Sequence, residues 1–503
     1  MPKKIILIGC GGVGKTFLEM MIVAKFHPTG FAKHVIILEP RDLSDEPTIH
    51  DLRSHNYVVD VVQVEVVKSN VNKLLDKYVS TGDIVLDVSY NVAFQPLINH
   101  CSKVEAHYIN TSLERWEMKD EDDLNSDYQE RVLHTMHVKV KELCKAAKTK
   151  STIVVTHGMN PGLITHFTCT ALTKLAHFIL KTAKKRKISN LHVNLLNVAY
   201  KNRNYALMGY LMSLRTVHCS ERDTQVSKVK REKNTFMNTW GPYSFYSEGV
   251  DPVQLGWGTH EDEKLTPFAR RKIKVVLPTY GEKNQIFPHI RGVDLMLKSY
   301  VPVVNKDGEL TNKPGEIIGM AISHSENDTA NQYLSLYNEG QLIYRPSNYY
   351  VYSPCKDAWD SLAEVKKSKY NMLKNQFALR GHDIASGEDA VGSLLVFSCD
   401  PVQKILHDKI DTGTTSFWSG TILNISQAKK LGFKHAGPTT IQVGISLINA
   451  IKWMLANPKQ GLCFPEDLPH EKIIADSAKY LGTVFMDFVP YSPKAADIDA
   501  FIK

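Results

Sequence analysis

The sequence KKIILIGCGGVG at residues 3–14 decides the first half of the fold. A short apolar run at residues 3–8 is typical of a buried β-strand, and it leads directly into Gly9, Gly11, Gly12 and Gly14. In this spacing Gly9 makes a tight turn, Gly11 lets the backbone approach a pyrophosphate, and Gly14 lets the next helix pack on the sheet. The stretch therefore predicts a dinucleotide-binding strand, turn and helix, with Gly12 and Val13 at the helix start.

Strand-like and helix-like segments alternate on the C-terminal side of this motif, as in βαβ units with a parallel sheet. The predicted strands cover residues 3–8, 35–38, 58–66, 84–88, 108–110 and 152–156. The predicted helices cover residues 13–26, 71–79, 92–101 and 128–147. Six parallel strands of this kind make one doubly wound domain.

The pattern changes after residue 160. Residues 191–200 and 273–277 still read as strands, and residues 440–455 have apolar side chains at helical spacing. The polar stretches 201–270 and 280–350 are expected to be functional loops or lids. The predicted fold is α/β: a Rossmann-type doubly wound parallel sheet over 1–157, a second α+β catalytic domain over 158–438, and a C-terminal helical segment over 439–503 that packs back on the core.

Composition excludes several classes of protein. The chain has 503 residues, 43% hydrophobic and 23% charged, which disfavours a disordered, fibrous or membrane protein. Lys and Arg number 61 against 53 Asp and Glu, and 61 − 53 = +8 is spread along the chain. The dense basic run at residues 184–187 follows an apolar segment and is typical of a helix C-terminus. We expect no nucleic-acid or membrane partner.

The eight cysteines lie far apart, without a CxxC or CxxH pair. This scatter argues against a structural metal site and against a disulfide scaffold, and it favours a reducing compartment. We therefore expect a cytoplasmic protein without a metal.

Glu39, at the end of the second predicted strand, is placed to bind the ribose hydroxyls of a dinucleotide. A carboxylate there would repel a 2′-phosphate, so NAD is favoured over NADP although Arg41 is close by. The alternative is a glycine-rich turn that binds no ligand.

Polar residues follow the predicted strands at the sheet edge where such cofactors bind. We expect these residues to line the nicotinamide: Ser89, Asn110, Thr111, Ser112, His157 and Pro161. A plain turn and helix start at Pro161 is the alternative for the last of them.

Further motifs extend over nearly the whole chain. They are INTSLERW at residues 109–116, HGMNPG at 157–162, ERDTQ at 221–225, NTW at 238–240, SEG at 247–249, LGWGTHE at 255–261, AISHSE at 321–326 and MDFVP at 486–490. In this order and over this length, the sequence resembles the homospermidine synthases, within the saccharopine dehydrogenase-like group.

The resemblance implies an NAD-dependent aminobutyl transfer between polyamines, in which two putrescines give homospermidine and ammonia. A hydride passes from the amine-bearing carbon to NAD, the resulting imine loses its nitrogen, and a second putrescine forms a Schiff base that receives the hydride back. NAD is then regenerated in each cycle, and the resemblance also suggests a homodimer.

The resemblance assigns the acidic pocket to Glu114, Glu221 and Glu248, because a dication needs carboxylates to hold it and a base to free its reacting amine. Trp240 is expected to face the cationic iminium, a contact worth roughly 0.5–2 kcal/mol. Asn160 is expected near the nicotinamide. His324 and Asp389 complete the catalytic residues that the resemblance implies.

Ordinary structural roles stay open for these residues, since a glutamate beside Arg222 is typical of a surface ion pair and a tryptophan of a core. Two other functions stay open as well. A saccharopine- or carboxynorspermidine-type dehydrogenase would need Arg or Lys for an α-carboxylate, and Arg115 and Arg203 are the candidates. A non-catalytic NAD-binding homologue is the third reading. The first reading requires the three glutamates to converge on one pocket.

Overall fold

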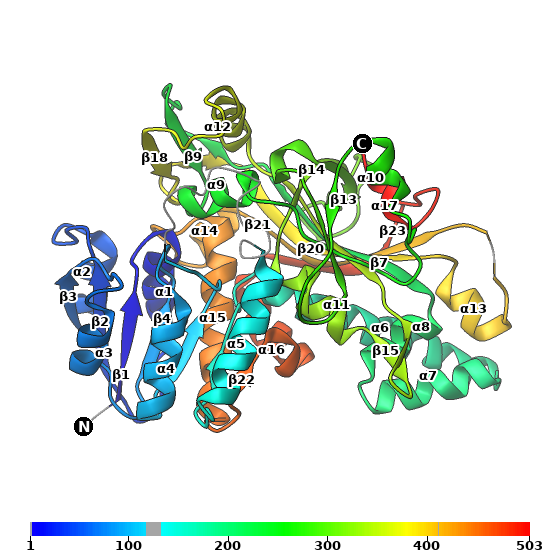
Figure 1. Cartoon of the computed structure of the whole chain (residues 1–503), viewed down its shortest axis with the longest axis horizontal. Helices are drawn as coiled ribbons and strands as arrows, with labels where there is room; N and C mark the ends of the chain where they lie inside the picture. Colours follow the sequence, from blue (N-terminus) through cyan, green and yellow to red (C-terminus); the bar gives the residue numbers. More distant parts are fainter. Residues whose placement is uncertain (1–2, 117–131, 411) are drawn as a thin grey trace.

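The computed structural model describes residues 3–116, 132–410 and 412–503. Its two large sheets are built mainly from residues 3–154 and from residues 214–489, respectively (Figure 1). The elements of the first half are β1 (Lys3–Ile8), α1 (Gly12–Val23), β2 (Phe31–Glu39), α2 (Pro47–Ser54), β3 (Val58–Gln63), α3 (Val71–Tyr78), β4 (Ile84–Asp87), α4 (Phe94–Val104), β5 (His107–Asn110), α5 (Leu133–Ala146) and β6 (Ile153–Val154).

The first sheet is parallel throughout, in the order β22-β6-β5-β4-β1-β2-β3. The six predicted strands are confirmed, and β22 (Leu462–Cys463) adds a seventh from the C-terminal region. Successive residues of β1 point to opposite faces, so Ile5 and Leu7 pack with α1 while Ile6 and Ile8 pack with α3 and α4. Both faces of this sheet are therefore covered by helices, as in a doubly wound domain.

The predicted helix over 128–147 is observed as α5, from Leu133 to Ala146. The first residues of that prediction, 128–131, lie outside the described residues.

The second sheet has ten strands and is mixed, because β17 and β7 pair in parallel while its other pairs are antiparallel. Its strands are β7 (Leu214–Asp223), β10 (Leu255–Gly256), β11 (Val275–Val276), β12 (Gln285–Pro288), β13 (Met296–Tyr300), β14 (Glu316–Ile322), β17 (Ser347–Ser353), β20 (Glu388–Phe397), β21 (Thr415–Asn424) and β23 (Thr483–Val489). The predicted fold class, a doubly wound domain with a second α+β domain, is confirmed.

Two-stranded pairs and further helices surround this sheet. The pairs are β8 (Val226–Ser227) with β19 (Ile384–Ser386), β9 (Thr235–Asn238) with β18 (Asn375–Ala378), and β15 (Leu336–Asn338) with β16 (Gln341–Tyr344). The helices are α6 (Leu163–Arg186), α7 (Leu191–Lys201), α8 (Tyr205–Leu211), α9 (Pro242–Val250), α10 (Thr266–Arg270), α11 (Thr329–Tyr333), α12 (Lys356–Lys367), α13 (Pro401–His407), α14 (Ile425–Lys430), α15 (Pro438–Ala456), α16 (His470–Ser477) and α17 (Ile498–Phe501).

Two expectations for this half are wrong. Residues 191–200 form helix α7 instead of a strand, because Asn190 caps the helix through the Val193 amide and Val193, Leu196 and Ala199 give it one buried face. The polar stretches 201–270 and 280–350 contain most strands of the second sheet rather than loops alone. Of the strand predicted over 273–277, only Val275–Val276 is extended in β11.

Helix α6 is long and apolar enough to cross a membrane by length and composition, but 72% of its most apolar window is buried within the fold. It packs across the second sheet, where Thr168 Oγ1 contacts Ser393 Oγ of β20 at 2.7 Å. Lys184, Lys185 and Arg186 form its last turn, which confirms the predicted basic helix end. Its burial is that of a core helix.

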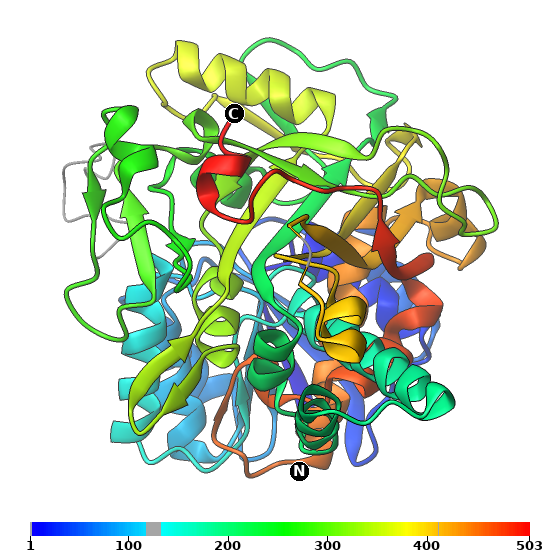
Figure 2. The ribbon, with the colours of Figure 1, turned by 90° about the vertical axis from the view of Figure 1, so that its right-hand side faces the viewer.

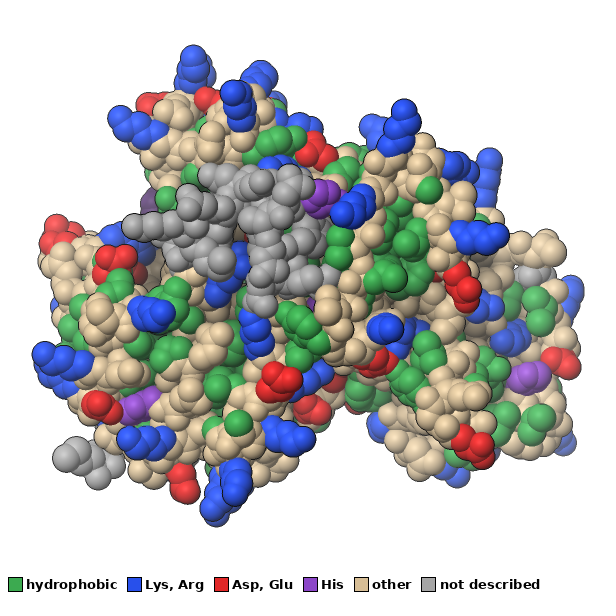
Figure 3. Space-filling view, viewed as in Figure 1, with side chains coloured by type: hydrophobic (Ala, Val, Ile, Leu, Met, Phe, Trp, Pro, Cys, Tyr) green, Lys and Arg blue, Asp and Glu red, His purple; other side chains and the backbone are tan. Residues whose placement is uncertain are grey.

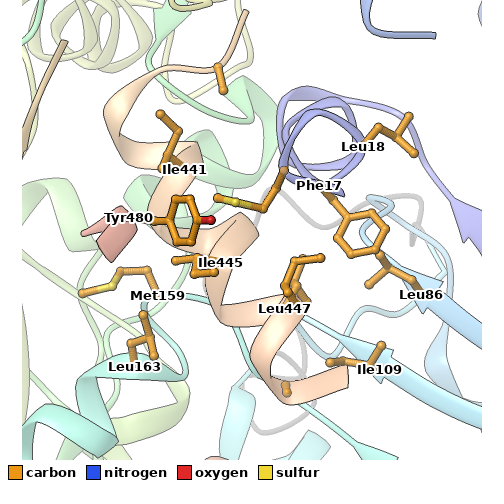
Figure 4. Close-up of a cluster of buried hydrophobic side chains, with 14 of the residues drawn as sticks. Phe17, Leu18, Leu86, Ile109, Met159, Leu163, Ile441, Ile445, Leu447 and Tyr480 are labelled. Atoms are coloured by element: carbon orange, nitrogen blue, oxygen red, sulfur yellow. The ribbon is translucent and has the colours of Figure 1, made fainter. Parts of the chain in front are cut away.

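The C-terminal residues join both halves. Helix α15 packs on α1, and Figure 4 shows Ile441 and Ile445 of α15 between Phe17 of α1 and Met159, which precedes α6. Thr16 Oγ1 donates to Thr440 Oγ1 at 2.8 Å in this contact. The segment 439–503 also supplies β22 to the first sheet and β23 to the second, so it is not helical alone (Figures 1 and 2). This return of the chain fixes the two halves against each other.

Candidate active site

The glycine turn after β1 has the geometry that a dinucleotide requires. Gly9 has φ +85°, and a Cβ there would lie 2.8 Å from the Ser89 Cα. A Cβ on Gly14 would lie 2.6 Å from the Gly9 carbonyl oxygen, whereas a Cβ on Gly11 would meet nothing within 4 Å. Gly9 and Gly14 therefore hold the turn together, while Gly11 leaves open space at the uncapped start of α1.

Glu39 ties this turn to the end of β2. Its carboxylate accepts from the Cys10 amide at 2.7 Å and from Arg41 Nε at 2.6 Å, and it is 3% exposed. Burial favours the neutral acid, but these hydrogen bonds keep the pKa of Glu39 below its ordinary value. Glu39 is thus an anion beside the glycine turn, where a ribose would lie.

A cavity of about 180 Å³ begins at the glycine turn and reaches the second domain. Its lining includes Gly11, Gly12, Lys15, Trp240, Arg380 and Thr440. Glu46 bridges the two domains at this cavity, with its carboxylate 2.5 Å from Lys15 Nζ and 2.9 Å from Arg380 Nη2. Burial opposes ionisation, but the two cations lower the pKa of Glu46 to about 2. The two cations and the open start of α1 therefore fit the phosphates of a dinucleotide, of which a cavity of this volume encloses only a part.

The polar residues at the carboxyl ends of the strands form one network. Ser89 Oγ donates to Asp87 at 2.5 Å, Tyr108 links Asp87 to the Asn110 amide, and the Asn110 carbonyl accepts from the His157 amide at 2.9 Å. The Asn110 side chain is 0% exposed, so it orients these loops from inside the fold.

The neighbouring loops close around the same edge. Thr111 lies next to Gly158, where a Cβ would approach its methyl group to 3.5 Å. The Pro161 carbonyl accepts from the Gly158 amide, and the Asn160–Pro161 peptide is cis. Ser112 Oγ donates to Glu114 at 2.7 Å. The predicted nicotinamide-lining residues thus lie at one edge of the first sheet.

Asn160 and Glu221 join the two domains. The Asn160 side-chain amide donates to Glu221 Oε2 at 2.6 Å, and the Tyr350 hydroxyl of β17 donates to the same oxygen. Burial raises the pKa of Glu221 to about 7, although these hydrogen bonds act in the opposite direction. The pKa of Glu221, next to the cofactor loop, is therefore near neutral pH.

His324 lies between two glutamates. Its Nδ1 is 2.8 Å from Glu326 and its Nε2 is 3.7 Å from Glu248, and its ring meets the Tyr350 ring edge-on at 4.7 Å. Burial would lower the pKa of His324, but the two carboxylates raise it to about 10. His324 is thus an imidazolium that neutralises part of the acidic pocket.

Glu114 lies in the loop that follows β5, at the cofactor edge of the first sheet. Burial raises its pKa to about 7, with Ser112 and the Asn91 amide as its hydrogen-bond donors. The neighbouring Tyr90 contacts Ser247 at 3.1 Å, one residue before Glu248. Glu221 and Glu248 influence each other electrostatically, as expected for one pocket. Among the described residues, the Glu114 carboxyl contacts Ser112 and the Asn91 amide and neither of those two glutamates, so its place in the pocket stays a prediction.

Trp240 and Asp389 complete the set of predicted residues. Trp240 is half-buried, packs on Phe245 at 5.8 Å, and lines the cavity that starts at the glycine turn. Asp389 is 1% exposed and accepts from Gln442 of α15 at 3.2 Å.

Sequence reasoning missed Tyr350, Glu326, Asp223 and Tyr352. Two of them carry a local signal, because Asp223 follows Glu221 by two residues and Glu326 follows His324 by two. The two tyrosines of β17 contact the site through pairing with β7, which the sequence does not reveal.

Comparison with known protein families first shows what the N-terminal domain is similar to. Residues 5–155 match the family described as the saccharopine dehydrogenase NADP binding domain. Residues 5–155 are therefore similar to a dinucleotide-binding domain of the dehydrogenase type, in agreement with the glycine turn.

The whole chain is similar to homospermidine synthases. It is 26% identical to that of Mesorhizobium japonicum over 494 residues, covering 97% of this chain and 91% of the relative. It is 24% identical to that of Blastochloris viridis over 507 residues, covering 98% and 92%. The crystal structure of the Legionella pneumophila homospermidine synthase in complex with NAD has the same fold, with a TM-score of 0.78, 23% identity and coverage of 100% and 98%. The resemblance seen in the motifs is confirmed.

The glycines give a first test. We expect Gly11→Val to fold but to lose dinucleotide binding at least about tenfold, because the added side chain fills the space for the pyrophosphate. Gly14→Val should instead lower the thermal unfolding midpoint, because its Cβ meets the Gly9 carbonyl. NAD titration and thermal melts of both variants check this. A Gly11→Val protein that binds NAD as tightly as the parent would contradict the assignment.

Proposed function

We propose that the protein is an NAD-dependent homospermidine synthase, which converts two putrescines into homospermidine and ammonia. The observation that carries this proposal is a buried carboxylate pocket at the edge of a dinucleotide site. Among the described residues, Glu221, Asp223 and Asp389 form no ion pair with Lys or Arg, although they are at most 4% exposed. Carboxylates buried without a cation suit a substrate that brings its own positive charges.

NAD, when bound, accepts a hydride from the amine-bearing carbon and later returns one. Gly11, Gly12 and Glu39 would hold it, with Lys15 and Arg380 near its phosphates. Ser89, Thr111, Ser112, His157 and Pro161 would border the nicotinamide.

The substrate residues divide by position. We assign Glu114, on the cofactor side, the removal of a proton from the reacting ammonium, because its pKa of about 7 suits a general base near neutral pH. Glu221 and Asp389 hold the distal ammonium. Glu248 acts beside His324, and Asn160 orients Glu221. We assign Trp240, which lines the cofactor cavity, the contact with the cationic imine.

The alternative of an amino-acid dehydrogenase has weaker support. Its substrate carboxylate needs a cation in the pocket, and Arg203 is instead at the surface, 3.1 Å from Glu471. Arg115 is the remaining candidate for binding a substrate carboxylate, and it directly follows Glu114 in the sequence. A non-catalytic homologue would leave the acidic pocket without a use.

A homodimer, a cytoplasmic location, and the absence of nucleic-acid and membrane partners stay predictions. The net positive charge does not argue for a nucleic-acid or membrane partner, because Lys and Arg are scattered over the face shown in Figure 3. The domain limits also stay proposals.

The direct test is product formation. Purified protein with NAD⁺ and putrescine should give homospermidine and ammonia by mass spectrometry, without net NADH. Trp240→Ala should lower kcat/KM by up to about thirtyfold while NAD binding persists. Trp257→Ala, a half-buried indole beside Phe268 in another cluster, is the matched control. No product from protein with verified bound NAD would refute the proposal.

The pH profile tests Glu221 separately. Tyr350→Phe removes a donor that stabilises the Glu221 carboxylate, so the pKa of Glu221 rises further. If ionised Glu221 is needed, the acid limb of kcat/KM moves up by roughly one pH unit. Tyr349→Phe is the control, because this buried β17 tyrosine also donates to a carboxyl, that of Glu261, which lies outside the site. An acid limb that stays in place in Tyr350→Phe would contradict this role.

A further inference from the structure

Three carboxylates meet on one face of the second sheet, where β7 pairs with β20. Glu221 and Asp223 are two residues apart on β7, so their side chains share a face. Asp389 of β20 is the cross-strand partner of Asp223, so its side chain lies on the same face, and its carboxyl and that of Glu221 act on each other electrostatically. The three side chains are 3%, 4% and 1% exposed, respectively. They therefore form one buried acidic cluster.

The hydrogen-bond donors around this cluster are neutral. Asp223 accepts from the Gln225 backbone and side chain and from Thr239 Oγ1, and Asp389 accepts from Gln442. The titratable groups facing the cluster are Tyr350 and Tyr352 of β17, Cys219 of β7, Cys355 before α12, and Glu248 of α9, which is already beside His324. Three adjacent buried carboxyl groups without a cation cannot all be ionised, since the anions repel, so the cluster holds at least one proton.

A second observation points to a ligand. The Tyr352 hydroxyl is in a side chain that is 0% exposed, and it finds no hydrogen-bond partner among the described residues. Tyr352 is the register neighbour of Glu221, and the charges that act on it are those of Glu221, Asp223 and Asp389. The oxygen of the Gln442 amide, whose nitrogen donates to Asp389, is likewise without a partner in the described part of the chain. Buried oxygens left unpaired around a carboxylate cluster suit a ligand that donates several hydrogen bonds.

We propose that Glu221, Asp223 and Asp389, lined by Tyr352 and Gln442, form a site that takes up a substrate ammonium group in exchange for a proton. The exchange balances: a charged amine enters from solvent, the proton held by the cluster leaves to solvent, and the net charge of the site is unchanged. Burial raises the pKa of Glu221 to about 7 and that of Asp223 to about 6, so a proton is available to leave near pH 7. Asp223 is thereby a binding residue for the amine.

The site lies where a diamine could span to the cofactor. Glu221 is joined to Asn160 of the cofactor loop, and Asp223 is joined to Thr239, next to Trp240. The site would thus hold the distal amine while the other amine reaches the nicotinamide. This step rests on the proposed function, whereas the proton exchange itself requires only that a diamine binds.

The test uses NADH-loaded protein, in which putrescine binds but cannot transfer a hydride. Calorimetric titrations near pH 7 in phosphate and in Tris, buffers of different ionisation enthalpy, give the number of protons released. We expect about one proton per putrescine bound. The neutral isostere 1,4-butanediol should release none.

Variants assign the proton to this cluster. Asp223→Asn should weaken putrescine binding roughly tenfold or more and reduce proton release. Glu261→Gln is the matched control, since Glu261 is a buried carboxyl that accepts from Ser347 and Tyr349, outside this cluster. It should leave both measurements unchanged.

Putrescine binding without proton release by the parent protein would overturn the inference, even if homospermidine is formed. Unchanged release in Asp223→Asn would remove Asp223 from the site. Proton release that Asp223→Asn reduces, in a protein that forms no homospermidine, would support the site and refute the proposed function.

Discussion

The hydrogen bond from Asn160 to Glu221 is the contact on which the site depends. It joins the loop after β6, at the cofactor edge of the first sheet, to β7 within the second sheet. Its 2.6 Å length requires both sheets to meet at this point, and α15 holds them there by packing on α1 and contacting Asp389 through Gln442. A redox cofactor and a buried acidic pocket are thereby adjacent.

The first domain could be predicted because its local signals agree with one another. In β1 every residue from Ile5 to Ile8 is buried, and the glycine turn follows at once. In the second domain the signals conflict. Strand β7 reads LRTVHCSERD, and most of its polar side chains are buried. Glu221 and Asp223 belong to the site, whereas Thr216 and His218 form hydrogen bonds elsewhere in the core. The sequence of α7 alternates apolar and polar residues for a few positions, but its cap and its buried face are helical.

The site residues could be predicted from the family resemblance more than from the pattern of the sequence. Glu221, Asn160, Glu248 and His324 are in one chain of contacts, although composition would assign each an ordinary role. Tyr350 could not be predicted, because its contact with Glu221 arises from strands far apart in the sequence. Net charge was equally uninformative. The local balance matters, since His324 offsets Glu248 and Glu326 while Glu221, Asp223 and Asp389 are left for a cationic ligand.

The central claim is that a hydride leaves one carbon of the substrate and returns to it within a closed site. Putrescine with deuterium on both nitrogen-bearing carbons tests this directly, in the presence of NAD⁺ and of unlabelled NADH, which would dilute any deuteride that leaves the site. Mass spectrometry should find homospermidine that keeps all of its deuterium, because the hydride that is removed is also the one returned. Homospermidine that lacks deuterium at a carbon beside the new nitrogen would contradict the account.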